Sequence, residues 1–230
     1  MSQSIYSGDP NKTQIALTFD DGPHPEFTAK LLDILSKYGI QVTFFCIGTH
    51  VNELADLVKR EAGEGHLVVN HTFTHPHLPQ LDDASVSKEL GDTNTAIQTA
   101  IGDAPAYFRP PYGETDDRVN NLAEALGLTP IIWSVDSNDW QGPGADAIYN
   151  TLMSAQNGSI ILCHDAVATS DQTLAAVDRA IPDLQAKGFS FVTIADLLAD
   201  GVQPEQMMLS SFAITIPHPH TPAIAQGIAV

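Results

Sequence analysis

The chain has 230 residues, 43% of them hydrophobic, which is enough for one sizeable core. Its 28 acidic residues against 10 Lys and Arg give a formal net charge of -18, which argues against nucleic acid and anionic membrane surfaces as partners. No apolar run approaches the roughly 20 residues that span a bilayer, so the composition predicts a soluble globular protein.

Short β-branched apolar runs alternate with helical periodicity along most of the chain, which is the pattern of repeated βα units. Parallel strands joined by helices follow from this alternation. The seven expected strands cover residues 15–19, 42–47, 67–69, 106–108, 131–135, 159–162 and 189–193.

The expected helices lie between these strands and have recognisable ends. The first stops at Gly39, the second begins at the N-cap Asn52, and the third runs from near Asp82 to Gly102. Pro182 lies inside the last helix and predicts a kink or a restart there. The remaining helices are expected around residues 119–126, 145–156 and 171–187.

The absence of a break in composition predicts a single α/β domain over residues 12–200. Residues 1–11 form an N-terminal lead-in, and 201–230 form an irregular C-terminal tail with one expected strand at 212–216. Cys46 and Cys163 each lie in an apolar run, which is typical of buried free thiols. The first residues carry no apolar stretch of the kind found in an export signal.

Two acidic residues stand at the end of the first strand, before the turn of Gly22-Pro23. Because neighbouring residues on a strand point to opposite sides, Asp20 and Asp21 are expected to do two different jobs. The alternative is a solvated acid pair in a turn.

A pair of histidines follows the third strand. His71 and His75 are four residues apart, a spacing that can present two imidazole nitrogens to one divalent ion. Asp21 would complete a His, His, Asp set with open positions for water, as in catalytic metal sites. The alternatives are a surface histidine pair, or a ligand role for His77 instead.

Three more polar clusters, at residues 109–112, 136–140 and 162–165, also fall at strand ends. The C-terminal ends of parallel strands open on one face, where catalytic groups gather. Each cluster has a purely structural alternative: Arg109 as a surface ion pair, Trp140 as a loop anchor, and His164 as a hydrogen-bonded core histidine.

Taken together, the five clusters at residues 18–23, 71–75, 109–112, 136–140 and 162–164 resemble the ordered motifs of the polysaccharide deacetylases, the family 4 carbohydrate esterases with the NodB homology domain. The resemblance covers about residues 12–200. It implies a distorted (β/α) barrel with about seven parallel strands.

The resemblance also implies a set of site residues. Asp21, His71 and His75 would hold one divalent transition metal, with zinc expected and cobalt, nickel or manganese as alternatives. Asp20 would be the general base and His164 the general acid. Among the supporting residues, Arg109 would hold Asp20 ionised, and Asp136, preferred over Asp139, would raise the pKa of His164. The backbone N–H of Tyr112 would stabilise the oxyanion. The substrate pocket would be lined by Trp140, Leu162 and Pro110.

The implied activity is removal of N-acetyl groups from β-1,4-linked N-acetylglucosamine in chitin, chitooligosaccharides or peptidoglycan, with release of acetate. One alternative is an O-acetyl esterase on acetylxylan with the same machinery, and another is an inactive carbohydrate-binding homologue. We expect a monomer that is secreted or at the cell surface.

Overall fold

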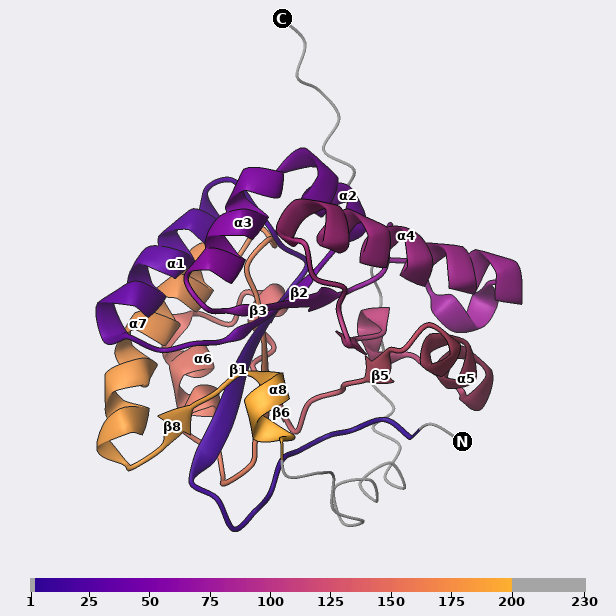
Figure 1. Cartoon of the computed structure of the whole chain (residues 1–230). Helices are drawn as coiled ribbons and strands as arrows, with labels where there is room; N and C mark the ends of the chain where they lie inside the picture. Colours follow the sequence, from indigo (N-terminus) through magenta and orange to yellow (C-terminus); the bar gives the residue numbers. More distant parts are fainter. Residues whose placement is uncertain (1–2, 200–230) are drawn as a thin grey trace, which may run out of the picture.

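The computed structural model describes residues 3–199, and its centre is a curled, mostly parallel sheet (Figure 1). The strand order is β5-β4-β3-β2-β1-β7-β6, and β8 pairs with the start of β1. This half-barrel confirms the predicted single α/β domain with a distorted barrel. The strands are β1 (Gln14–Asp20), β2 (Thr43–Cys46), β3 (Leu67–Asn70), β4 (Tyr107–Phe108), β5 (Thr129–Pro130), β6 (Val135–Asp136), β7 (Ile160–His164) and β8 (Ser190–Phe191).

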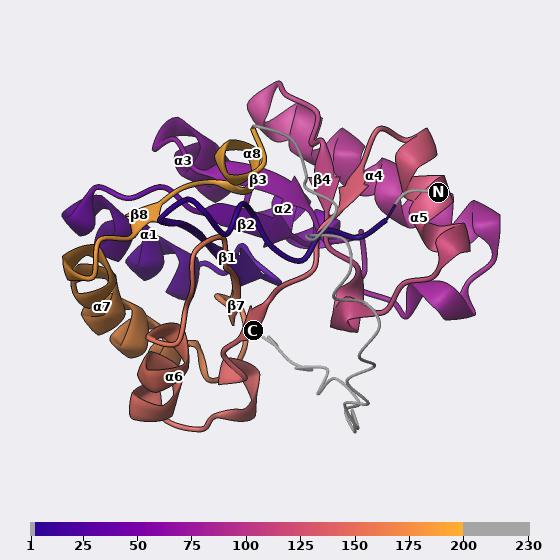
Figure 2. The same cartoon turned by 90° about the horizontal axis from the view of Figure 1, so that it is seen from below.

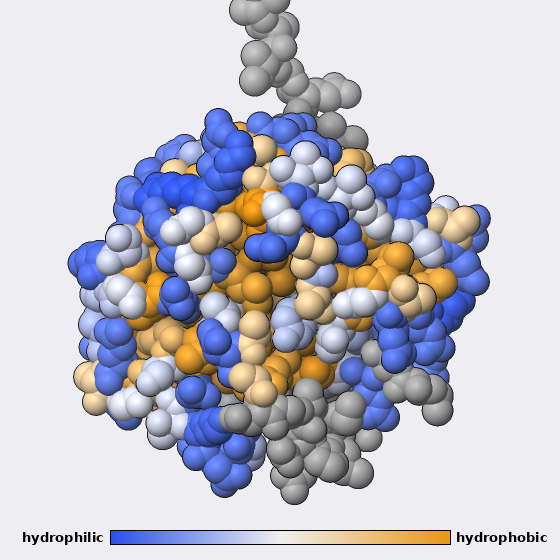
Figure 3. All heavy atoms as spheres, viewed as in Figure 1, coloured by the Kyte–Doolittle hydropathy of each residue, from blue (hydrophilic) through white to orange (hydrophobic). Residues whose placement is uncertain are grey.

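Helices pack around the outside of the sheet in the order α6, α7, α1, α3, α4 and α5 (Figure 1). Hydrophilic side chains cover much of this outer rim, while apolar ones show mainly near the centre of the face in Figure 3. The helices are α1 (Phe27–Tyr38), α2 (Gly48–Glu53), α3 (Ala55–Gly63), α4 (Asp83–Ile101), α5 (Asp117–Ala125), α6 (Ala145–Leu152), α7 (Ser170–Ala186) and α8 (Ile194–Leu197). In the described residues, no helix is both long and apolar enough to cross a bilayer.

The two faces of each central strand have different surroundings, as the pleat of a strand requires. Phe19 and Phe44 point outward and belong to the larger core between the sheet and the helices. Ala16 and Phe45 point inward to a smaller cluster inside the curl. The inner face also carries Thr18, a polar residue that is fully buried.

The predicted strand at 131–135 is wrong, because this segment joins two short strands at opposite ends of the sheet. β5 ends at Pro130 and β6 begins at Val135. Between them the chain crosses the open side of the half-barrel, where the main chain of Ile5 bonds to Pro130 and Ile132. The N-terminal segment then reaches the start of β7 through a bridge from Ser7 to Ser159, and Figure 2 shows it crossing the molecule. The lead-in is therefore part of the fold.

Two helix predictions also need correction. Asn52 is not an N-cap: α2 begins at Gly48, and Leu54 with φ -126° and ψ 38° separates it from α3. Of the kink or restart predicted at Pro182, the restart does not occur, because α7 continues to Ala186. Proline cannot donate to the carbonyl four residues earlier. That carbonyl, on Asp178, instead accepts a hydrogen bond from the hydroxyl of Tyr38 at 2.7 Å. The predicted tail at 201–230, with its strand at 212–216, lies outside the described residues.

Candidate active site

The C-terminal ends of the strands place the polar clusters around one cavity of about 290 Å³. β1 supplies Asp20 and the turn after it Asp21, while β6 supplies Asp136 and β7 supplies His164. The loop after β3 supplies His71 and His75, and the segment after β4 supplies Tyr112. The cavity is lined by Asp20, Asp21, His71, His75, Tyr112, Trp133, Asp136, Trp140, Leu162, His164 and Val167.

Asp21, His71 and His75 form the cluster of potential metal ligands that the described residues contain. Asp21 Oδ1 lies 3.4 Å from His71 Nε2 and 3.3 Å from His75 Nε2. The Nδ1 of His71 is 2.8 Å from the carbonyl of Arg109, so its N–H donates there and leaves Nε2 as the lone-pair nitrogen facing the cluster. Asp21 Oδ1 is buried and has no hydrogen-bond partner among the described residues. This donor set fits a divalent transition metal.

The protonation states of this cluster suit a cation. Burial alone would raise the pKa of Asp21, but the close contact with His71 and the charges of the nearby histidines hold it below its usual range. Burial lowers the pKa of His75 to about 4, against the opposing charge of Asp21. At neutral pH the site therefore offers a carboxylate and a neutral imidazole, which are the forms that bind metals.

Left-handed backbone is concentrated at this cavity. Asp21 has φ 74°, His75 has φ 61° and Tyr112 has φ 61°. Residues other than glycine adopt this conformation at a cost of about 1–2 kcal/mol each. The expectation that Asp20 and Asp21 point to opposite sides therefore fails at the end of β1, because the left-handed turn at Asp21 brings both carboxylates to the same cavity.

Asp20 is held from inside the curl by Arg109. The Arg109 Nη1 lies 2.6 Å from Asp20 Oδ1 and also donates to Thr18 Oγ1 at 2.8 Å. Arg109 is fully buried, and its guanidinium lies 4.0 Å from the centre of the Phe45 ring. Arg109 is thus a core residue rather than a surface ion pair. Its guanidinium fixes the orientation of Asp20, whose other oxygen is 3.7 Å from His71 Nε2.

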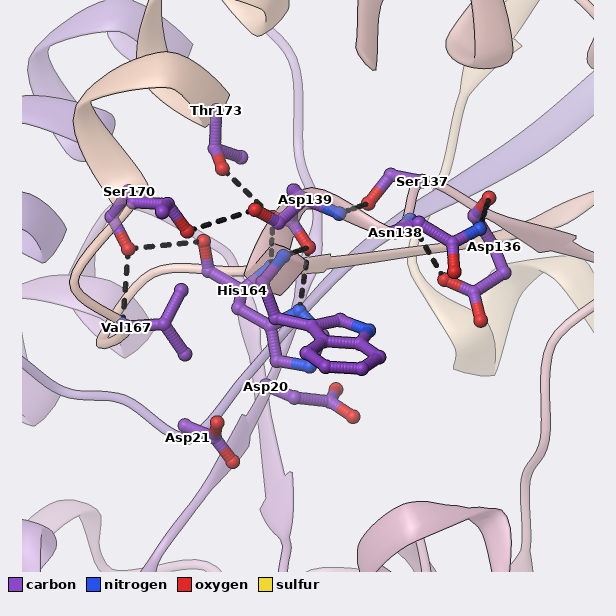
Figure 4. A network of polar contacts seen from close by, with 12 residues as sticks. Asp20, Asp21, Asp136, Ser137, Asn138, Asp139, His164, Val167, Ser170 and Thr173 are labelled. Carbon is purple, nitrogen blue, oxygen red and sulfur yellow. Dashed lines mark hydrogen bonds and ion pairs between the residues drawn. The ribbon is translucent and has the colours of Figure 1, made fainter. Parts of the chain in front are cut away.

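The partner of His164 is Asp139, which corrects the preference for Asp136. Asp139 Oδ1 is 2.7 Å from His164 Nδ1, and its Oδ2 accepts hydrogen bonds from the backbone N–H of His164 and the hydroxyl of Thr173, both at 2.8 Å (Figure 4). The left-handed Asn138 turns the chain between the two acids, so that Asp139 points back toward β7. Asp136 instead lines the cavity, with Oδ1 bonded by the N–H of Asn138 at 2.9 Å.

The charge of Asp139 changes the titration of His164. Burial by itself would lower the pKa of His164, but the charge and hydrogen bond of Asp139, with smaller contributions from Asp21 and Asp20, raise it to about 10. The imidazole is therefore a cation at neutral pH. Burial raises the pKa of Asp136, whereas the contacts with His164 lower the pKa of Asp139 against the effect of its own burial.

The apolar wall of the cavity differs in part from the expected one. Trp140 and Leu162 line it as expected, but Pro110 is buried and is not among the lining residues. Trp133 and Val167 line it and were missed by the sequence analysis. Trp133 lies in the segment misread as strand interior. An aromatic residue only a few positions before the 136–140 cluster was the one feature of the sequence that could have indicated its place in the cavity wall.

Asp165 belongs to the predicted cluster at residues 162–165, but the sequence analysis assigned it no role. It lies behind the turn after β1, where a Cβ on Gly22 would come within 2.5 Å of Asp165 Oδ1. Thr28 donates to Oδ2, while Oδ1 is buried with no partner among the described residues. Burial, together with the charges of Asp21 and Asp20, raises the pKa of Asp165 to about 7.

Comparison with known proteins gives consistent matches. The polysaccharide deacetylase family model matches residues 7–131. The peptidoglycan-N-acetylglucosamine deacetylase of Bacillus cereus is 38% identical over 194 residues, covering 84% of this chain and 70% of the relative. The chitooligosaccharide deacetylase of Rhizobium leguminosarum bv. trifolii is 40% identical over 188 residues, covering 76% and 87%. Among solved structures, a family 4 carbohydrate esterase pseudoenzyme from Bacillus anthracis matches with TM-score 0.80 and 30% identity, covering 86% of this chain and 69% of that one.

Proposed function

This chain belongs to the polysaccharide deacetylase family, and we propose that it removes N-acetyl groups from β-1,4-linked N-acetylglucosamine in chitooligosaccharides, chitin or peptidoglycan. One observation carries the proposal. A cavity that holds the Asp21, His71 and His75 cluster also holds a carboxylate paired with a buried guanidinium and a histidine paired with a buried carboxylate. These are the groups that hydrolysis of an amide requires.

Asp21, His71 and His75 are the residues that would hold one divalent transition metal, with zinc as the expected ion and cobalt, nickel or manganese as alternatives. Two imidazoles and one carboxylate are a donor set that zinc prefers in catalytic sites. When bound, the ion supplies a Lewis acid that polarises the acetyl carbonyl and acidifies water.

The residues of the chain then divide the proton transfers. Asp20, held in place by its ion pair with Arg109, accepts a proton from the attacking water. The backbone N–H of Tyr112 donates to the oxyanion that develops on the acetyl carbonyl. His164, protonated through its contact with Asp139, gives a proton to the departing nitrogen. The C–N bond breaks, and the products are acetate and a free amino sugar.

The apolar side chains of the cavity fit the acetyl group. Trp140 and Leu162 lie in the wall beside His164 and would contact the acetyl methyl. The names of the two curated relatives support an N-acetylglucosamine substrate, in an oligosaccharide or in peptidoglycan. Such substrates lie outside the cytoplasm in cell walls and chitin, so we infer a secreted or cell-surface location. We also propose that the protein works as a monomer, because one chain supplies every polar group of the proposed mechanism.

The test is a panel of substrates with released acetate as the measurement. Zinc-loaded protein is incubated with chitooligosaccharides, peptidoglycan and acetylxylan, and Asp20→Asn serves as the matched inactive control. Acetate from the N-acetyl sugars is the expected result. Acetate from acetylxylan alone would favour the O-acetyl esterase alternative. Tight binding of chitooligosaccharides without any acetate would favour the inactive homologue, which the presence of Asp20, Arg109, Asp139 and His164 argues against.

A further inference from the structure

The sequence left His77 as an alternative metal ligand, but it is not part of the cluster of Asp21, His71 and His75. Its ring instead stacks on the ring of Tyr112, with centroids 4.1 Å apart and planes 15° apart. The Tyr112 ring also lies edge-on to the ring of His75, with centroids 4.6 Å apart and planes at 70°. Tyr112 is thus packed between a potential metal ligand and His77.

The backbone at Tyr112 needs such support. Tyr112 and the following Gly113 are both left-handed, with φ 61° and φ 69°. Only Gly113 adopts this conformation without a steric cost. Gly113 is also confined, since a Cβ there would come within 2.9 Å of the Trp133 ring. The direction of the Tyr112 N–H depends on this turn, and a donor for an oxyanion must be aimed before the reaction begins.

His77 contacts the turn at two residues, Tyr112 and Glu114. Its face holds the side chain of Tyr112, and its Nδ1 is 2.8 Å from Oε2 of Glu114, two residues further along the chain. At its own end, His77 is joined to His75 through Pro76, whose ring restricts the backbone. A short path of contacts therefore links the His75 ligand to both ends of the Tyr112 turn.

We propose that His77 and Glu114 are positioning residues, which clamp the turn at Tyr112 and so fix its backbone N–H relative to the metal ligands. The proposal rests on the proposed function for its catalytic consequence. His77 and Glu114 are 39% and 43% exposed, and polar contacts between side chains so exposed add little to stability. The proposed role of the pair is to fix geometry. The ring of His77 packs against the Tyr112 side chain, and the contact with Glu114 keeps the His77 ring in that position.

The experiment compares three variants with wild type. His77→Ala removes the ring, His77→Phe keeps a ring without the hydrogen bond, and Glu114→Gln keeps a neutral partner. We expect kcat for acetate release to fall about tenfold or more in His77→Ala, since losing a whole oxyanion donor costs about 10²–10³. KM and the bound metal should stay within about twofold of wild type, and His77→Phe and Glu114→Gln should each recover most of kcat. Asp92→Asn, which breaks the exposed ion pair with Lys88, is the matched control and should match wild type.

Amide hydrogen exchange of Gly113 and Glu114, whose N–H groups donate to the carbonyls of Pro110 and Pro111 within the turn, gives a readout in the metal-free protein that does not need activity. We expect exchange to be about tenfold faster in His77→Ala than in wild type or His77→Phe, because the turn opens more often. If wild type releases no acetate, the proposed function fails, while the exchange rates still test the clamp. Loss of metal in His77→Ala, a change in KM alone, equal losses of kcat in the Ala and Phe variants, or unchanged exchange would each overturn it.

Discussion

Replacing Asp139 by Asn should move the alkaline limb of the pH profile, because it removes the charge that keeps His164 protonated. With Asp139 in place the pKa of His164 is about 10, so the imidazole is almost fully protonated at pH 8. Without that charge, burial is the largest remaining influence and holds the pKa at or below its ordinary value of about 6.5. The protonated fraction at pH 8 then falls to about 3% or less, which predicts a loss of about thirtyfold in kcat/KM at that pH.

The assay is acetate release from a chitooligosaccharide between pH 5 and 10, with kcat/KM plotted for each protein. NMR titration of the His164 ring in the metal-free protein follows the same pKa directly. Asp136→Asn is the matched control, because it makes the same chemical change three residues away and leaves the pair of His164 and Asp139 intact. Its alkaline limb should stay near that of wild type.

The reasoning fails if Asp139→Asn keeps the alkaline limb of wild type. It also fails if Asp136→Asn shows the larger shift, since Asp136 would then be the residue that controls His164. A loss of activity in Asp139→Asn that is equal at pH 6 and pH 8 would point to a disturbed cavity instead of a changed pKa.

Four further results are expected. Asp20→Asn should abolish acetate release yet keep bound metal, whereas His71→Ala should lose the metal; elemental analysis distinguishes them, and loss of metal from the first would mean that the two aspartates are assigned the wrong way round. Arg109→Met should lower the free energy of unfolding by about 3–5 kcal/mol in urea, because a buried carboxylate loses its partner; an effect under about 1 kcal/mol would contradict that burial. Deleting residues 1–8 should cost about 2 kcal/mol or more, because the buried side chain of Ile5 and its bridges are lost; an unchanged melting temperature would show that the lead-in is dispensable. In the metal-free protein, the pKa of Asp165 is about 7 in the folded state and about 3.9 in the unfolded state, so its contribution to stability is present below pH 4 and is lost as the pH rises to 7. Asp165→Asn should therefore flatten the plot of unfolding free energy against pH between pH 4 and 7. Parallel plots for the two proteins would refute this assignment.

The sequence predicted the framework of the fold because its signals there are local. Gly39 ends α1 in a left-handed C-cap, and the side chain of Asp82 accepts the N–H of Ser85 at the start of α4, as their positions indicated. The segment at 131–135 was misread because β-branched residues favour extended backbone without saying which neighbour they pair with. Its two ends in fact lie at opposite edges of the sheet.

The position of a side chain in the cavity could be predicted where the end of a strand carries it, as for Asp20 and His164. It could not be predicted where a single turn decides which of two like residues faces inward. Asp136 and Asp139 are the same residue type in one cluster, and only the left-handed Asn138 between them determines that Asp139 meets His164. The burial of Arg109 was equally hidden, because its partners Thr18 and Phe45 come from other strands.

The crossing between β5 and β6 limits how far the molecule can deform. Only four residues, 131–134, join strands at opposite edges of the sheet, so a fully extended connection from Pro130 to Val135 spans at most about 18 Å. Ile131 and Ile132 are also buried, which ties the crossing to the interior. The curl therefore cannot flatten or spread to admit a polymer. The proposed glycan substrate would therefore meet the cavity at its open rim without a change in the sheet, and adaptation to different glycans would be left to side chains and surface loops.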